Sequence, residues 1–469
     1  MNTSKRLALV ALVVLALSAC AKRAEKTVQQ VVPPPFAELA EAKMAYNPVI
    51  AKMLAQVSPD TLKSLVAALA SFETRHTLSD TTSEHRGIGA ARRWLERRLL
   101  TYRAACGGRL QVECDRWSQE IPGMGMASLV NVLAILPAPD PRLQSRVVLL
   151  CAHYDSRSGE AKDPVASAPG ANDDGSGVAA LLELARVLGM YRFEATLVFA
   201  AVVGEEQGLL GSARLAEQVQ QRGWELMAVL SMDMIGNVVG GNGLVDSTRV
   251  RCFSEGLSYT ESEDEARRRW RMGGESDSPS RQLARYAKAQ AETYLPDLAV
   301  SLVFRPDRLG RGGDHLSFNR AGFAAVRFTE ANEHFGHQHQ LVRIEGGVQY
   351  GDLPEFLSYS YLTRVTKAVG AVAAGLALSP RPPQEVTVDR GQGYDARLRW
   401  DDPEPMNDLA GYKIYVRQTT SPVWQKQLFV RNATVAVIKG LCIDDYFFAV
   451  AAVDRDGNES LPRFATLGP

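Results

Sequence analysis

Histidine and acidic side chains follow several apolar runs of the sequence, at the points where those runs end. His153 and Asp155 come directly after "VVLLCA", Glu205 and Glu206 follow "FAAVVG", and Asp233 lies inside "VLSMDMIGN". Adjacent unpaired carboxylates at the end of an apolar strand repel each other and destabilise the fold. We therefore expect a positively charged group beside them.

The segment "PGANDDGSG" adds two more carboxylates, Asp173 and Asp174, at the start of a predicted helix. Either aspartate could cap that helix, because aspartate is a favoured N-cap residue. If Asp173, Glu206 and Asp233 face one site, they gather three negative charges in a partly dry place, which is prohibitive without cations. Two divalent cations and one hydroxide would balance this charge.

The residue types favour zinc as the metal. Imidazole and carboxylate ligands without a thiolate suit zinc, although cobalt or manganese can occupy the same ligands. We expect His153 to bind one ion, Asp173 to bridge both ions, and Glu206 and Asp233 to complete one ion each.

Two further acidic residues are predicted to act without binding metal. Asp155 lies two positions after His153, so the two side chains point to the same side of an extended strand, and Asp155 can orient a ligand imidazole. Glu205 would remain unligated and act as the base that takes a proton from water.

The elements that position these residues form an alternating pattern. Apolar strand-like runs, such as "SLVNVLAIL", "RVVLLCAHYD" and "ATLVFAAVVGEE", alternate with helical runs such as "SGVAALLELARVLG". This alternation predicts an α/β fold with a mainly parallel central sheet and helices on both faces. Sites in such folds form beyond the carboxyl ends of the strands, where the residues above lie.

The first residues are typical of an exported protein. Lys5 and Arg6 precede an apolar run that ends in "LSAC", which resembles the bacterial lipobox, with lipid carried on Cys20. We predict a signal peptide over 1–19 and a lipid-anchored tether over 20–40. Ala21 favours the outer membrane over the inner one.

The rest of the chain divides into two parts. Residues 41–378 form the predicted α/β domain, with an insertion at about 238–300, and the proline-rich residues 379–385 form a linker. Short alternating strands over 386–469 predict a β-sandwich, which resembles a fibronectin type III domain through Trp400, Leu441 and Tyr446.

Composition excludes one class of partner. The 469 residues carry 53 basic and 53 acidic side chains, which gives no basic excess for nucleic acid. Cys106 and Cys114 are close in sequence and form the expected disulfide pair, while Cys252 and Cys442 have no assigned partners.

Four motifs in order, "HYDS", "PGANDDGSG", "GEEQGLLGS" and "MDMIGN", resemble metallopeptidase family 28, the co-catalytic zinc aminopeptidases. The resemblance covers roughly residues 85 to 375 and implies the ligand, orienting and base roles given above. It also implies a late histidine ligand, for which spacing in "HFGHQHQ" favours His337, with His339 second and His334 third. "GRGGDHLSF", with Asp314 and His315, resembles a family segment near the pocket, where it either takes part in the site or packs against it without touching metal.

The expected activity is removal of N-terminal residues from peptides. A glutaminyl cyclase shares this fold and uses one zinc, whereas a carboxypeptidase or other amidohydrolase would use the same ions with a different pocket. A non-catalytic surface lipoprotein is the remaining alternative, and the presence of every ligand type and of Glu205 disfavours it.

Overall fold

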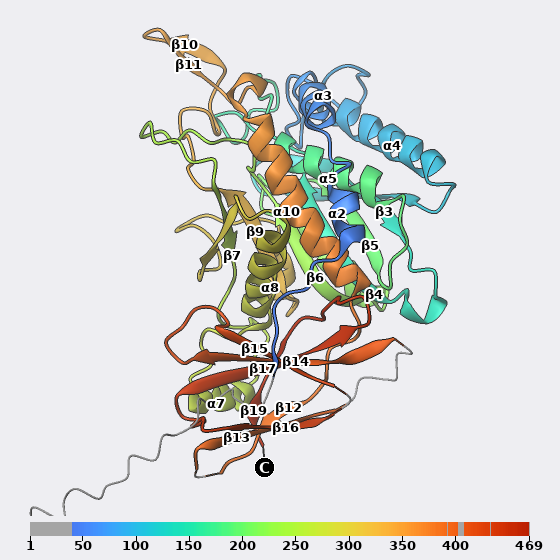
Figure 1. The fold of residues 1–469 in the computed structure, drawn as a ribbon. Helices are drawn as coiled ribbons and strands as arrows, with labels where there is room; N and C mark the ends of the chain where they lie inside the picture. Colours follow the sequence, from blue (N-terminus) through green and yellow to red (C-terminus); the bar gives the residue numbers. More distant parts are fainter. Residues whose placement is uncertain (1–39, 392, 402–407, 432, 469) are drawn as a thin grey trace, which may run out of the picture.

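The structure is a computed structural model that describes residues 40–391, 393–401, 408–431 and 433–468. An α/β domain occupies one end of the molecule, and an all-β sandwich formed by the last strands occupies the other (Figure 1). The predicted signal peptide and Cys20 lie outside the described residues. Among the residues that are described, no helix is both long and apolar enough to cross a bilayer.

The central sheet has eight strands in the spatial order β2-β3-β5-β4-β6-β9-β7-β8. Their bounds are β2 Gln111–Ile121, β3 Gly125–Leu136, β4 Arg146–His153, β5 Thr196–Val202, β6 Glu225–Met232, β7 Arg249–Phe253, β8 Ala299–Val303 and β9 Ala325–Glu330. The four central strands, β5, β4, β6 and β9, are parallel neighbours. They bring the predicted site residues to one edge.

The sheet is mixed: its central strands and the pair β7–β8 are parallel, as predicted, whereas other pairs are antiparallel. Strand β3 runs antiparallel to both β2 and β5, and β7 runs antiparallel to β9. Ile121 pairs with Gly125 across a short turn between β2 and β3. Strands joined by such a turn must run antiparallel, since a parallel pair needs a long crossover connection.

Helices cover both faces of the sheet, as predicted. One face carries α2 Pro48–Leu54, α3 Pro59–Ala70, α4 Gly87–Ala105, α5 Gly175–Leu188, α8 Pro279–Tyr294 and α10 Tyr359–Leu378, and the other carries α6 Leu210–Gln221 and α9 His315–Arg320. Strand β4 is apolar on both sides: Val148 and Leu150 face the first helix layer, and Val147 and Leu149 face the second. This double burial explains its continuous apolar sequence.

The sandwich packs two sheets over a core of its own. Its strands are β12 Val386–Val388, β13 Asp395–Trp400, β14 Leu409–Gln418, β15 Lys426–Val430, β16 Val435–Lys439, β17 Tyr446–Asp454, β18 Arg463–Phe464 and β19 Thr466–Leu467. One sheet has the order β15-β14-β17-β18 and the other β16-β13-β12-β19. Trp400, Tyr412 and Phe448 lie in the shared core.

Two segments expected elsewhere contact or complete these sheets. Strand β1 (Ala40–Glu41), placed in the tether or at the domain start by the sequence, pairs with β15 at the edge of the sandwich. The expected insertion at 238–300 supplies strand β7, which lies inside the central sheet, and helix α7 (Glu263–Met272), which lies against the sandwich (Figure 1). The insertion therefore contributes a strand to the α/β domain and a helix that contacts the sandwich.

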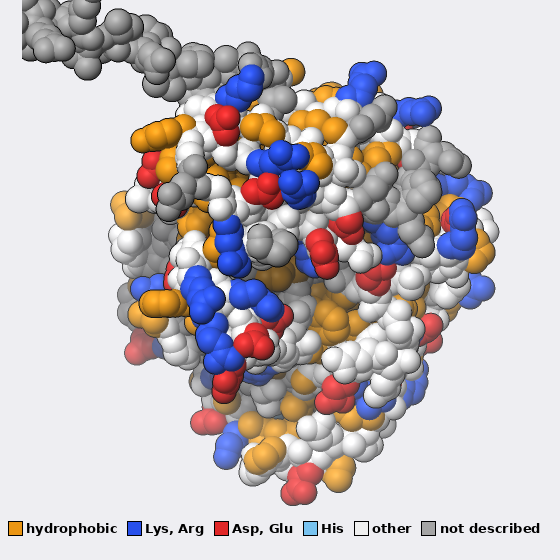
Figure 2. Space-filling view, turned by 90° about the horizontal axis from the view of Figure 1, so that it is seen from below, with side chains coloured by type: hydrophobic (Ala, Val, Ile, Leu, Met, Phe, Trp, Pro, Cys, Tyr) orange, Lys and Arg blue, Asp and Glu red, His pale blue; other side chains and the backbone are white. Residues whose placement is uncertain are grey.

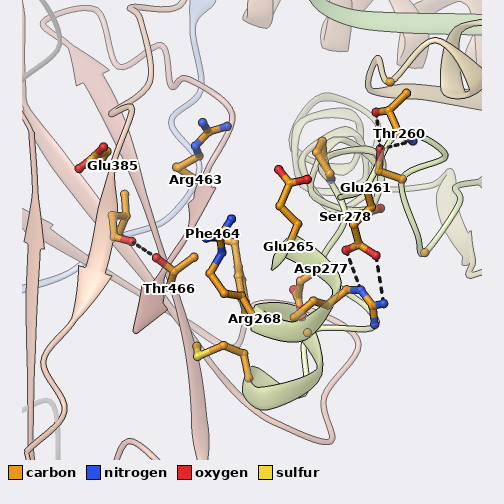
Figure 3. A pocket seen from close by; sticks show the side chains of 18 of the residues that line it. Thr260, Glu261, Glu265, Arg268, Asp277, Ser278, Glu385, Arg463, Phe464 and Thr466 are labelled. Carbon is orange, nitrogen blue, oxygen red and sulfur yellow. Dashed lines mark hydrogen bonds and ion pairs between the residues drawn. The ribbon is translucent and has the colours of Figure 1, made fainter. Parts of the chain in front are cut away.

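A groove of about 700 Å³ separates α7 from the sandwich edge. Figure 3 shows Glu265 and Arg268 of α7 on one wall and Arg463, Phe464 and Thr466 on the other. Seen from this end, the molecule carries basic and acidic side chains interspersed over its surface (Figure 2). This mixture agrees with the balanced composition.

The described cysteines carry no disulfide. Cys106, Cys114, Cys151, Cys252 and Cys442 are all free thiols. The expected Cys106–Cys114 pair is therefore wrong for this structure. Cys106 follows α4 and is buried, whereas Cys114 lies within β2 and is half-buried.

Candidate metal centre

Five of the predicted side chains converge at the carboxyl edge of the parallel strands, in two groups that share Asp173. In the first group, His153 Nε2 lies 3.3 Å from Asp173 Oδ1 and 3.9 Å from Asp233 Oδ1. In the second, His339 Nε2 lies 3.0 Å from Asp173 Oδ2 and 3.0 Å from Glu206 Oε1. The ligand atoms of each group lie within 4.8 Å of one another.

The fold places these residues by ending elements at them. His153 is the last residue of β4, and its Nδ1 lies 3.2 Å from the backbone oxygen of Asp155. Asp174 is the N-cap of α5, where its Oδ1 accepts a hydrogen bond from Gly177 N at 2.9 Å. Asp174 therefore caps the helix, and its neighbour Asp173 is free to face the cluster.

The carboxylate of Asp155 lies near His153 and binds backbone groups of the following turn. Its Oδ1 lies 3.7 Å from His153 Nδ1 and accepts a hydrogen bond from Gly204 N at 2.8 Å. The same carboxylate also accepts bonds from the backbone N–H groups of Glu205 and Glu206. Asp155 thus fixes the turn after β5 that carries the candidate base and one candidate ligand.

The two imidazoles show how strongly this centre attracts positive charge. Burial alone would lower the pKa of His339, but Glu206 and Asp173 outweigh it and raise that pKa to about 10. Burial likewise opposes the charging of His153, and the nearby carboxylates of Asp173 and Asp233 raise its pKa well above the ordinary value. Both shifts show that the carboxylates favour positive charge at the two imidazoles.

The donor set fits zinc ions. His153 Nε2 and Asp233 Oδ1 are buried and have no hydrogen-bond partner, although they lie within 4 Å of each other. Buried polar atoms are almost always satisfied, so two orphaned donor atoms facing one point indicate a ligand between them. Imidazole and carboxylate donors are those that zinc takes in catalytic sites.

Glu205 lies beside the cluster but belongs to neither ligand group. Burial raises its pKa well above the ordinary value for glutamate, and the adjacent Glu206 raises it further, against the opposing effect of His153. A carboxylate with a raised pKa can accept and return a proton near neutral pH. This environment suits the predicted role of general base.

The late histidine differs from the expectation. His337 belongs to neither ligand group of the described residues: its ring stacks between His334 and Phe356, with centroid distances of 3.6 Å to each. Burial and the neighbouring His334 lower its pKa to about 4. The geometry replaces His337 with His339, because the turn that follows His334 points the later side chain at Asp173.

Asp314 and His315 pack beside the site without entering either ligand group of the described residues. His315 Nε2 lies 2.7 Å from the backbone oxygen of Pro306, and burial lowers the pKa of His315 to about 4. Burial raises the pKa of Asp314 to about 7. Their placement agrees with the expectation that this segment packs near the pocket.

Sequence reasoning missed a buried guanidinium beneath the cluster. Arg75 is fully buried, and its guanidinium donates hydrogen bonds to four backbone oxygens. Its Nε donates to Tyr154 O at 2.7 Å, and its Nη2 donates to Gly170 O at 2.9 Å. Pro169 O and Leu69 O accept from Nη1. Arg75 thus joins the end of β4 to the loop that leads to Asp173.

A second missed residue is Asp352, which holds the backbone of the same loop. Its carboxylate accepts hydrogen bonds from Asn172 N at 2.9 Å and from Asp173 N at 2.7 Å. Burial raises the pKa of Asp352 to about 7. No spacing pattern links Asp352 to the motifs, because its partners are backbone groups nearly 180 positions away.

Comparison with known proteins identifies the class that this fold and site define. The model of peptidase family M28 matches residues 131–341. A probable zinc metalloprotease of Pyricularia oryzae is 40% identical over 444 residues, which cover 91% of this chain and 87% of that protein. The chain belongs to peptidase family M28, and it is a zinc-type metallopeptidase whose substrates are peptides.

Other relatives and structures agree with this assignment. A probable zinc metalloprotease of Pyrenophora teres f. teres is 37% identical over 87% of this chain and 85% of its own length. The LapA aminopeptidase of Legionella pneumophila has the same fold, with a TM-score of 0.52 and 18% identity over 74% of this chain and 79% of LapA. The two relatives are fungal, so they lend no support to the predicted bacterial lipoprotein signal.

Proposed function

We propose that this protein is a secreted exopeptidase, an aminopeptidase that removes N-terminal residues from peptides and holds two zinc ions per chain. The observation that carries the two-ion proposal is the position of Asp173. Its Oδ1 faces His153 at 3.3 Å and its Oδ2 faces His339 at 3.0 Å. A carboxylate with one oxygen toward each of two donor groups suits the bridge of a two-metal site.

The ligand roles follow from the two groups. His153 and Asp233 would hold one ion with Asp173, and Glu206 and His339 would hold the other. Zinc at these two places supplies Lewis acidity for the attack of water on a peptide carbonyl.

Glu205 moves the proton in this scheme. Its carboxylate takes a proton from the attacking water as the new C–O bond forms, and it delivers that proton to the leaving amine nitrogen as the C–N bond breaks. Asp155 keeps Glu205 in place through the backbone hydrogen bonds of the turn after β5. The proton that Glu205 accepts from water is therefore the proton that it returns to the leaving amine.

Metal analysis coupled to an activity assay tests the proposal. We expect two zinc ions per chain, hydrolysis of aminoacyl anilides, and loss of this activity on chelation with recovery on adding zinc. Glu205→Gln is expected to retain both ions and to lose at least ~100-fold in kcat, which is the usual contribution of general base catalysis. Near-normal turnover of this variant would remove the base assignment.

Substrate capping separates the alternatives. An aminopeptidase cleaves substrates with a free α-amine and spares N-acetylated ones. Preferred cleavage of capped substrates would instead indicate a carboxypeptidase or another amidohydrolase, and cyclisation of N-terminal glutamine with one zinc per chain would indicate a glutaminyl cyclase. If the protein turns over none of these substrates, a non-catalytic binding role would remain.

We also propose that lipid on Cys20 anchors the protein at the cell envelope, in the outer membrane. The motif "LSAC" supports this proposal. Membrane fractionation of the natural protein and of Cys20→Ala tests it: the variant should leave the membrane fraction, and its retention there would refute lipid anchoring.

The strand grouping of the sandwich, with the first, second and fifth strands of residues 386–464 in one sheet, supports a fibronectin type III-like fold.

A further inference from the structure

A fully buried arginine contacts one of the candidate zinc ligands. Arg327 is the third residue of β9, and its side chain has no solvent exposure. Its Nη2 lies 2.9 Å from Asp233 Oδ2. No sequence motif singled out Arg327, which lies within the apolar run "AAVRFTE". A buried guanidinium is costly unless it is paired, so its position calls for an explanation.

Arg327 connects Asp233 to the loop between β8 and α9. Its Nη1 donates hydrogen bonds to Asp307 Oδ2 at 2.9 Å and to Gly312 O at 2.7 Å. The guanidinium therefore lies between the candidate ligand, with which Nη2 forms an ion pair without a hydrogen bond, and the loop, to which Nη1 is hydrogen-bonded. Such rigid, planar recognition of two partners is a property of arginine that lysine lacks.

The pairing continues outward as a chain of alternating charges. Arg308 Nε lies 3.0 Å from Asp307 Oδ1, and Arg308 Nη1 lies 2.8 Å from Glu333 Oε2. Arg251 Nη2 lies 2.6 Å from Glu333 Oε1. The chain thus alternates three carboxylates with three guanidinium groups, in the order Asp233, Arg327, Asp307, Arg308, Glu333 and Arg251. Counted with Asp233, the chain is electrically neutral.

The two oxygens of Asp233 have different surroundings. Oδ2 forms an ion pair with Arg327 Nη2 at 2.9 Å, whereas Oδ1 lies 3.9 Å from His153 Nε2 and has no hydrogen-bond partner. We infer that Arg327 is a positioning residue that fixes Asp233 so that only Oδ1 is presented to zinc. The inference rests on the proposed two-zinc site, in which Asp233 is a ligand.

Loss of the guanidinium would affect metal binding at one site. Without Arg327, Asp233 can rotate, and Asp307 loses one of its two arginine partners. Loss of a group that orients a metal ligand typically weakens metal binding by ~10–100-fold. We therefore expect Arg327→Met to raise the zinc dissociation constant of the His153–Asp233 site by ~10–100-fold. The Glu206–His339 site should keep its affinity.

The test is a zinc titration of chelator-stripped protein in competition with a chromophoric chelator. Arg251→Met is the matched control, because it removes a guanidinium at the outer end of the same chain and leaves the Arg327–Asp233 pair intact. The control should bind both ions with the affinity of the natural protein. Cobalt substitution adds a spectroscopic signature, in which the visible absorption of one of the two ions should change in Arg327→Met alone.

Two further variants keep the test decisive if Arg327→Met does not fold. Arg327→Lys retains the charge without the fork and should weaken the same site, but less than methionine does. Asp307→Asn removes the charge of the loop partner and should also weaken that site. Folded variants with natural or tighter affinity at both sites would overturn the inference. A natural protein that binds no zinc would instead refute the proposed function.

Discussion

At the scale of single residues, the sequence located most of the candidate centre because strand ends are visible as breaks in apolar runs. His153, Glu206 and Asp233 lie where those runs stop, and the structure brings all three to one edge. Spacing favoured His337 over His339 as the late ligand, whereas the geometry brings His339 beside Asp173 and Glu206. The path of the turn through residues 334–339 is set by contacts such as the stacking of His337 on Phe356, which a spacing pattern does not encode.

The two histidines give the first prediction at this scale. His339→Ala should lose one of the two zinc ions and most activity, because His339 Nε2 is 3.0 Å from both Asp173 and Glu206. His337→Ala should keep both ions, since its ring packs against Phe356 away from the carboxylates. Elemental analysis of purified variants checks this, and zinc loss in His337→Ala alone would reverse the assignment.

At the scale of elements, periodicity predicted the helix layers and the parallel centre of the sheet, but not its antiparallel edges. Strand direction depends on the length of the connection between strands, and the short turn before Gly125 was not recognised as a hairpin turn. Long-range supports were also missed. Arg75 has no sequence signature, because its partners are backbone oxygens rather than a spaced set of side chains.

Arg75 carries the prediction for the loop that leads to Asp173. Arg75→Lys leaves a single nitrogen for four backbone oxygens, and each buried polar group without a partner costs ~1–3 kcal/mol. We expect a lower free energy of unfolding and faster hydrogen exchange over residues 168–174.

The matched control is Arg86→Lys, which changes a half-exposed arginine whose Nη2 donates to Val165 O. This control should leave both quantities close to those of the natural protein. Unchanged exchange over 168–174 in Arg75→Lys would show that the loop is held by other contacts, such as those of Asp352.

At the scale of the whole molecule, buried ion pairs connect the sandwich to the α/β domain. Asp277 lies 3.1 Å from Arg285 Nη1 of α8 and 2.5 Å from Arg417 Nη2 of β14, and all three side chains are almost fully buried. Arg285 also donates a hydrogen bond to Pro422 O at 2.7 Å. The proline-rich linker gave no indication of these contacts, because a sequence pattern at a linker does not report contacts that are made elsewhere in the chain.

Asp277→Asn should therefore destabilise the full-length protein. The substitution leaves two buried guanidinium groups without their carboxylate, and breaking a buried ion pair typically costs ~3–5 kcal/mol. Glu225→Gln is the control, because Glu225 pairs with Arg381 at the exposed linker, where an ion pair contributes ~1 kcal/mol or less. Denaturant unfolding at neutral pH measures both; equal, small effects would indicate a loosely held sandwich.

The pairing of β1 with β15 has a consequence for biosynthesis. A ribosome delivers the chain from its amino end, yet Ala40 and Glu41 find their partners, Phe429 and Leu428, only after nearly the entire polypeptide has emerged. Long-range pairings of this kind form late, because a large loop must close first. Strand β1, the first described strand of the chain, is therefore expected to be among the last to pair, and its pairing with β15 completes the edge of the sandwich.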